Sequence, residues 1–162
     1  MKKLNLTLSS ILIFLIFNIF CSLALEIKII SGEAKVIDGD TIRIKNNKIR
    51  LYGIDAPELN QFCKNENKLW PCGKESKNLL NKIINSKISC NYIKKDRYGR
   101  ILGTCFLNGL DLNKLMVKKG FAVAYKKYSK KYLSFEEYAK KNKLGVWIGE
   151  FIRPEEWRKK NK

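Results

Sequence analysis

Three short segments carry the residues of this sequence whose types and spacing could do chemistry. They read Asp38-Gly39-Asp40-Thr41, Arg50 to Glu58, and Asp96 to Arg100. Carboxylates can hold a hard cation or activate water, and arginines bind phosphate oxygens through paired hydrogen bonds. Phosphodiester cleavage needs both kinds of group, because negative charge grows on the non-bridging oxygens in the transition state. Each segment alone is typical of a turn or a solvated loop, but together they indicate phosphodiester chemistry.

The composition excludes several other kinds of site. The 162 residues contain no histidine, which rules out Ser-His-Asp and Cys-His nucleophiles, two-histidine ribonuclease sites and histidine-ligated zinc. Lys and Arg number 33 against 15 Asp and Glu, giving a formal charge of +18. A hydrophobic fraction of 45% is ordinary for a folded domain, so the charge indicates a polyanionic partner better than it indicates disorder.

Two strands are expected to position the first two segments. Residues 41–45 and 48–52 are rich in β-formers, and the pair at 46–47 is Asn-Asn, which tolerates the positive φ of a tight hairpin turn. Alternation places the isoleucines and leucine of both strands on one face and therefore puts Arg50 on the other. The pattern predicts a hairpin whose apolar face is buried and whose arginine face is open to a substrate.

Helical patterns follow in the second half of the chain. Apolar spacing predicts a helix over 74–85, and a second over 111–120 with Asp111 as its N-cap. Ser134 to Glu137 has the pattern of a capping box, which predicts a third helix ending near residues 144–145. Strands followed by interspersed helices indicate an α+β domain with a small antiparallel barrel.

The N-terminus has the layout of a secretory signal peptide. A basic start is followed by an uncharged stretch, Leu4 to Leu25, and small residues precede a cleavage point after Ala24. The alternative is an uncleaved membrane anchor, because 22 uncharged residues can just span a bilayer. We expect residues 1–24 to be removed and residues 25–162 to form one secreted or periplasmic domain, with a core over about 34–147 and a basic tail after Pro154.

Four cysteines remain beyond the signal segment: Cys63, Cys72, Cys90 and Cys105. Residues 88–94 and 101–107 read as two strands of a hairpin, and a turn centred on 97–98 places Cys90 opposite Cys105 at a separation that suits a disulfide. Cys63 and Cys72 would then close the other loop. The alternatives are four reduced thiols or a Cys₄ metal site, which the absence of any Cys-x-x-Cys pair disfavours.

In order and spacing, these three segments resemble those of the thermonuclease, or staphylococcal nuclease-like, family, with similarity from about residue 34 to 147. The resemblance implies an OB-fold, a five-stranded antiparallel β-barrel with about three packed helices. It also implies Ca²⁺-dependent hydrolysis of DNA and RNA. The cysteine-containing insertion at 60–72 resembles the exported proteobacterial type of the family.

The resemblance also implies a set of metal ligands. Asp40 and Asp55 resemble the calcium carboxylates, and Ala56 would offer its backbone carbonyl. Asp38 resembles a nearby acidic residue that supports the site without binding the metal. Ala56 stands where the staphylococcal type has a hydroxyl residue, which leaves the main-chain ligand possible but changes the hydrogen bonding around Glu58.

The remaining roles fall on groups that would face the phosphate or the base. Glu58 resembles the carboxylate that handles the attacking water, and Arg50 and Arg100 resemble the pair of arginines that stabilise the transition state. Tyr125 and Tyr98 resemble residues that contact the nucleotide.

Two other classes of function stay open from the sequence. One is a nucleic-acid-binding module on the same barrel without hydrolysis, and the other is a membrane-anchored envelope protein. A binding module would not need a complete catalytic set, so the presence of all five of its charged residues favours the enzyme. These residues are Asp40, Arg50, Asp55, Glu58 and Arg100. We expect a monomer that acts on DNA and RNA and has no stable membrane association after signal cleavage.

Overall fold

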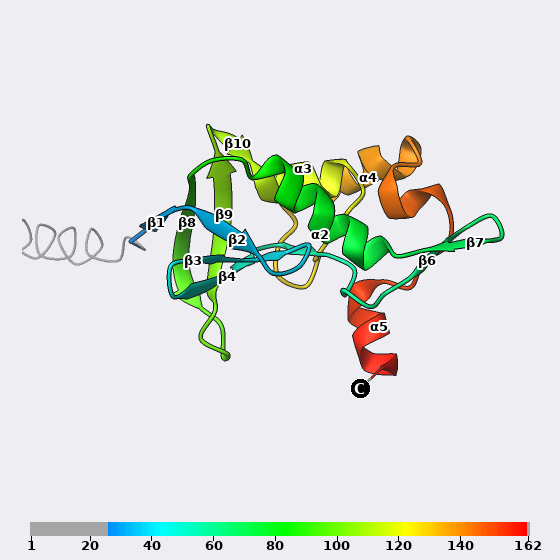
Figure 1. Ribbon diagram of the computed structural model, residues 1–162, viewed down its shortest axis with the longest axis horizontal. Coiled ribbons are helices and arrows are strands. Elements are labelled where there is room, and N and C mark those ends of the chain that lie inside the picture. Colours follow the sequence, from blue (N-terminus) through cyan, green and yellow to red (C-terminus); the bar gives the residue numbers. More distant parts are fainter. Residues whose placement is uncertain (1–25, 162) are drawn as a thin grey trace, which may run out of the picture.

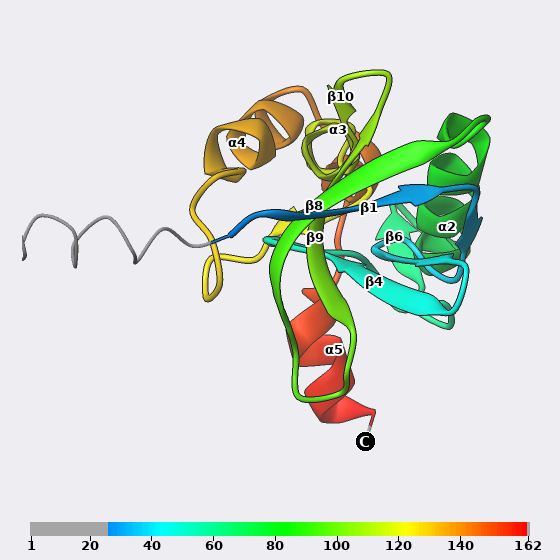
Figure 2. The same ribbon diagram turned by 90° about the vertical axis from the view of Figure 1, so that its left-hand side faces the viewer.

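The computed structural model describes residues 26–161; the expected signal peptide, residues 1–24, lies outside this range. The main sheet contains β1 (Lys28–Gly32), β2 (Ala34–Val36), β3 (Thr41–Ile44), β4 (Asn47–Leu51), β8 (Ile88–Lys95), β9 (Ile101–Leu107) and β10 (Leu110–Asp111). The strand order is β1-β8-β9-β4-β3-β2, and β10 pairs with β9. The β4–β9 pairing is parallel and the others are antiparallel. The sheet curls into a half-barrel (Figure 1, Figure 2).

Two small ladders complete the strands. β5 (Ile54–Asp55) pairs with β11 (Val123–Ala124), and β6 (Cys63–Asn65) pairs with β7 (Lys68–Trp70). The helices are α2 (Cys72–Ile83), α3 (Leu112–Lys118), α4 (Leu133–Lys141) and α5 (Pro154–Lys160), with a 3₁₀ turn at Gly145–Ile148. Figure 1 shows α2, α3 and α4 gathered on one side of the curled sheet, with α5 projecting below.

The expected α+β fold of OB type is confirmed, with three differences. Five barrel strands were expected, whereas the main sheet of the described residues has seven. Residues 26–161 contain four α-helices where about three were expected, because the basic tail forms α5. The sheet is also not wholly antiparallel, since β4 and β9 run in the same direction. No helix of residues 26–161 is long and apolar enough to cross a membrane.

The β3–β4 hairpin has the predicted faces but a shifted turn. Ile42 lies opposite Ile49, and both are fully buried. The two turn residues are therefore Lys45 and Asn46, with Lys45 at φ 51°, whereas Asn46-Asn47 was the expected turn. Both turns would place the same isoleucines and leucine on the buried face, so the apolar alternation does not distinguish the two registers.

Both expected disulfides are present. Cys90 pairs with Cys105 across the antiparallel β8–β9 ladder, with Cα atoms 4.0 Å apart. Cys63 and Cys72 join β6 to the start of α2, with Cα atoms 5.6 Å apart. The two bridges therefore fasten the loop that follows the second chemical segment and the hairpin that carries the third.

The start of the third expected helix differs from the capping-box prediction. Asp111 caps α3 as predicted, accepting a hydrogen bond from the Lys114 N–H at 2.9 Å. In contrast, α4 begins at Leu133, and no side chain caps it. Ser134 is the second residue of α4, and Glu137, the carboxylate of the expected capping box, pairs with Lys140 at 2.9 Å. The neighbouring Glu136 is fully buried and accepts a hydrogen bond from the Ala124 N–H at 2.6 Å, which joins α4 to β11.

Candidate active site

One cleft of about 610 Å³ lies between the β8–β9 turn and the loops after β2 and β4. Both α5 and this turn project to the same side of the sheet (Figure 1, Figure 2). The cleft is lined by Asp38, Asp40, Arg50, Ala56, Glu58, Tyr98, Arg100, Tyr125 and Arg158, among others. Eight of these nine are residues that the sequence singled out, and Asp55 lies just beneath them. The structure thus brings the three chemical segments to one place.

The Asp38–Thr41 loop fixes the orientation of the Asp40 carboxylate. The Asp38 carboxylate accepts a hydrogen bond from the Asp40 N–H at 3.0 Å. Asp40 in turn accepts hydrogen bonds from the Ala56 N–H at 2.7 Å and from the Thr41 hydroxyl at 3.1 Å. Burial raises the pKa of Asp38, although the nearby Arg50 opposes this shift. Asp38 therefore shapes the loop and holds Asp40 in place through the backbone, as expected for a supporting residue.

Arg50 joins the two expected metal carboxylates. Its side chain is only 12% exposed; it contacts Asp40 and donates to Asp55 Oδ1 at 2.7 Å. Burial lowers the pKa of Arg50, and the charges of Asp55 and Asp38 oppose this shift. The guanidinium therefore neutralises two carboxylates that β3–β4 and β5 bring together. In this structure Arg50 is committed to the acidic pair, whereas the sequence predicted that it would face the phosphate.

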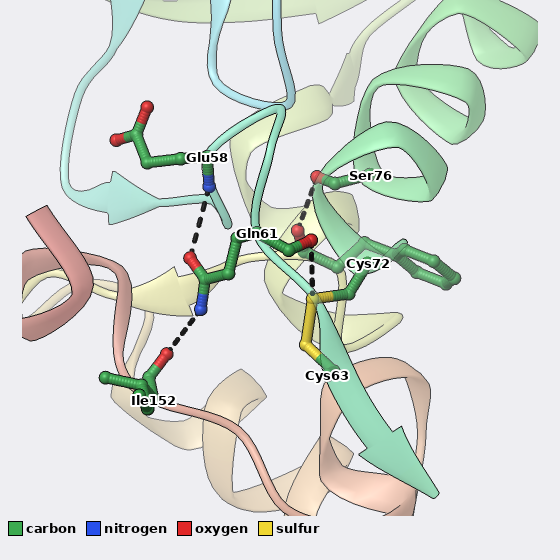
Figure 3. Close-up of a disulfide and its surroundings, with 7 residues drawn as sticks. Glu58, Gln61, Cys63, Cys72, Ser76 and Ile152 are labelled. Atoms are coloured by element: carbon green, nitrogen blue, oxygen red, sulfur yellow. Dashed lines mark hydrogen bonds between the residues drawn. A yellow bond between two sulfur atoms is a disulfide. The ribbon is translucent and has the colours of Figure 1, made fainter. Parts of the chain in front are cut away.

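Glu58 is held by a buried glutamine that the sequence analysis missed. The Gln61 amide oxygen accepts from the Glu58 N–H at 3.2 Å, and its NH₂ group donates to the Ile152 carbonyl at 2.6 Å (Figure 3). Gly73 of α2 packs so closely below that an added Cβ would lie 1.7 Å from the Glu58 carbonyl oxygen. Gln61 and Gly73 together fix the backbone from which the Glu58 side chain reaches the cleft.

The β8–β9 turn positions Arg100 on the far wall of the cleft. The Asp96 carboxylate accepts from the backbone N–H groups of Tyr98 and Arg100, each at 2.9 Å, and from Arg100 Nε at 2.8 Å. Burial would raise the pKa of Asp96, but the hydrogen bonds from Arg100 outweigh it and lower that pKa. Among residues 26–161, Arg100 makes no other side-chain hydrogen bond. Its Nη groups are therefore able to bind an anion.

Two tyrosines line the cleft beside these groups, as predicted. Tyr98 is 71% exposed, and the guanidinium of Arg100 lies 5.6 Å from its ring centre. Tyr125 packs edge-to-face on Tyr128 with ring centres 4.8 Å apart. Burial raises the pKa of Tyr125, and the charge of Asp55 adds to this effect. Both rings can contact a base through their faces.

The largest omission of the sequence analysis is Arg158. This residue of α5 donates to both oxygens of Asp55 at 3.0 Å and to Glu58 Oε1 at 2.7 Å. Burial would lower the pKa of Arg158, but these hydrogen bonds and charges outweigh it and raise that pKa. The sequence pattern identified the tail after Pro154 only as basic, and nothing local linked it to a residue 100 positions away.

The donor chemistry of the cleft fits a hard divalent cation. Asp40 and Asp55 converge on one guanidinium, which shows that their carboxylates can share a positive charge. Within residues 26–161, no three acidic or cysteine side chains form a ready cage. Two carboxylates supply only part of the oxygen ligands that a hard cation such as Ca²⁺ takes, so backbone carbonyls or water would have to complete such a site.

Comparisons with known proteins agree with this arrangement. A family model described as staphylococcal nuclease homologue matches residues 48–149. An uncharacterized endonuclease of Haemophilus influenzae is 34% identical over 157 residues, covering 91% of this chain and 83% of that protein. The succinoglycan biosynthesis protein ExoI of Rhizobium meliloti is 40% identical over 123 residues, covering 73% of this chain and 64% of that protein. The probable staphylococcal-like nuclease CAN3 of Oryza sativa subsp. japonica is 34% identical over 124 residues, covering 74% of this chain and 30% of that protein.

The extent of these matches differs between the relatives. The chain spans less than two thirds of the length of ExoI and CAN3, but most of the Haemophilus endonuclease. The family match includes Arg50, Asp55, Glu58 and Arg100, and it ends before α5. Arg158 thus lies outside the region that the family model covers.

Proposed function

Because the chain belongs to the staphylococcal nuclease homologue family, we propose that it is a Ca²⁺-dependent nuclease that hydrolyses DNA and RNA with little sequence specificity. The relatives named as endonucleases and nucleases support a nuclease function at the coarser level. The observation that carries the finer proposal is the convergence of Asp40, Arg50, Glu58 and Arg100 on one cleft.

Each residue of the cleft has a separate role in the proposed hydrolysis. Arg100 offers its free Nη groups to the non-bridging oxygens of the scissile phosphate, where charge grows in the transition state. Glu58 accepts a proton from the attacking water, or orients that water, as the water oxygen forms a new P–O bond and one ester P–O bond breaks. The departing ester oxygen takes up a proton from solvent and leaves as a hydroxyl group. Calcium, when bound, would neutralise phosphate charge and help to orient the water. Tyr98 and Tyr125 would hold the flanking base.

Arg50 has a second task in this proposal. In the described structure it neutralises Asp40 and Asp55, so a cation at these carboxylates would release part of its hydrogen-bonding capacity. Its guanidinium could then turn toward the phosphate without leaving the site. This accounts for one arginine serving both the acidic pair and the substrate.

The expected compartment and assembly belong to the same proposal. Two disulfides are consistent with an oxidising compartment, so we propose a secreted or periplasmic monomer. The positive charge would attract nucleic acid without sequence preference.

The test compares cleavage by wild-type protein with cleavage by Glu58→Gln on single- and double-stranded DNA and on RNA. Glu137→Gln is the matched control, since this exposed α4 residue pairs only with Lys140. We expect Glu58→Gln to lose at least about 100-fold in turnover and the control to keep the wild-type rate. Wild-type protein that binds the polymers without cleaving them would instead show a nucleic-acid-binding module.

A further inference from the structure

Arg158 pairs with Asp55, one of the two carboxylates that Arg50 joins, and with Glu58. Asp55 is only 2% exposed, and its Oδ1 accepts hydrogen bonds from both Arg50 at 2.7 Å and Arg158 at 3.0 Å. Its Oδ2 accepts a third bond from Arg158 at 3.0 Å. Both oxygens of the central carboxylate are thus taken up by guanidinium groups. Three of the roughly four acceptor sites of this carboxylate are therefore taken by cationic donors, so a metal ion bound here would lie against guanidinium charge.

Glu58 is engaged by the same group. Nη1 of Arg158 donates to Glu58 Oε1 at 2.7 Å, so one guanidinium bridges the expected metal carboxylate and the expected water-handling carboxylate. While this bridge stands, Oε1 of Glu58 accepts a hydrogen bond from Arg158, and that acceptor site is closed to a water molecule. The position of Arg158 therefore bears on both parts of the reaction.

The helix that carries Arg158 is firmly held at its start but not at its end. The Ile152 carbonyl accepts a hydrogen bond from Gln61, and Arg153 donates to the buried Glu136 and to the Ala124 carbonyl. Beyond Arg158 the helix ends within two residues, and Lys159 is 68% exposed. The Arg158 side chain itself is 33% exposed. It can therefore leave the carboxylates and enter solvent while the base of α5 stays in place.

We propose that Arg158 is an internal counter-ion that pairs with Asp55 and Glu58 in the metal-free protein and is displaced from Asp55 when a divalent cation binds. This inference depends on the proposed metal site, and it adds a residue that sets the affinity of that site. Displacement would also free Glu58 for the water. The same arginine stabilises the metal-free cleft and weakens metal binding, because the ion must first break the Arg158 pairs.

The test is calorimetric titration of the chelator-stripped protein with CaCl₂. Arg158→Gln should bind Ca²⁺ more tightly than wild type by about 5- to 150-fold, the range typical of a coupling free energy between two binding events. It should also unfold at a lower temperature in EDTA, because Asp55 and Glu58 lose a partner. Lys159→Gln is the matched control, since it removes one positive charge from the same helix turn but pairs only with Glu155.

A second variant covers the case in which Arg158→Gln does not fold. Arg158→Lys keeps the charge but cannot form the bidentate contact with Asp55, so it should bind Ca²⁺ with an affinity between wild type and Arg158→Gln. Unchanged or weaker Ca²⁺ affinity in the Arg158 variants, an equal gain in Lys159→Gln, or no Ca²⁺ binding by any of them would overturn the proposal.

These outcomes are separate from the fate of the nuclease proposal. Tighter Ca²⁺ binding by a variant that cleaves no nucleic acid would support the counter-ion and refute the nuclease. A Ca²⁺-dependent nuclease whose Arg158 variants bind Ca²⁺ like wild type would refute the counter-ion alone.

Discussion

Replacing Arg50 by glutamine should destabilise the metal-free protein by about 3 kcal/mol. The side chain is 12% exposed and bridges two carboxylates that are 9% and 2% exposed. Removing one partner of a buried ion pair costs about 3–5 kcal/mol, because the other charge is left uncompensated. We take the lower end because Arg158 continues to neutralise Asp55. For a domain of this size, the loss corresponds to a decrease in melting temperature of roughly 10 °C.

The assay is urea unfolding in EDTA, followed by tryptophan fluorescence. Arg43→Gln is the matched control, because it lies on the adjacent strand β3, is exposed and faces Lys48 across the hairpin. It should change the free energy of unfolding by less than about 0.5 kcal/mol. Excess Ca²⁺ should recover part of the stability lost in Arg50→Gln. Equal unfolding curves for the two variants in EDTA would refute the assignment of Arg50 as the counter-ion of this acidic pair.

Three further predictions follow from the same contacts. Arg100→Lys should lower the turnover on DNA by about 100-fold or more, since lysine cannot form paired hydrogen bonds to phosphate; a variant with wild-type kcat would show that Arg100 does not bind the transition state. Burial would raise the pKa of Glu136, but hydrogen bonds from Arg153 outweigh it and lower that pKa, so its stabilising contribution is present above the ordinary glutamate pKa and is lost as pH falls. Urea unfolding between pH 3 and 7 should therefore be less pH-dependent in Glu136→Gln, and an unchanged slope would contradict this role. Replacing both Cys90 and Cys105 by alanine should cost about 3 kcal/mol, because the bridge closes a loop of 15 residues; unfolding at the wild-type urea concentration would count against this estimate.

The sequence predicted those parts of the site that depend on local pattern. Strand alternation placed Arg50 on the other face of the sheet from the buried isoleucines, and the structure confirms this. The symmetry of the second hairpin placed Cys90 directly across from Cys105, which the structure also confirms. The turn between β3 and β4 was predicted one residue too late, because two consecutive asparagines give no local signal that distinguishes the registers.

The groups that the sequence missed all act across long separations. Gln61 links the Glu58 loop to Ile152, 91 residues away, and Arg158 reaches Glu58 from a separation of 100 residues. Neither residue belongs to a periodic pattern, and an arginine in a lysine-rich tail carries no local mark of a specific partner. Only the packing of the tail against the cleft reveals that its charge is used at the site.

The central claim is tested most directly by the rate of DNA cleavage as Ca²⁺ is removed and restored in one sample of purified protein. The account predicts cleavage in CaCl₂, complete loss in excess EGTA and full recovery when Ca²⁺ is added back. Cleavage at the original rate in excess EGTA, or intact DNA throughout, would contradict it.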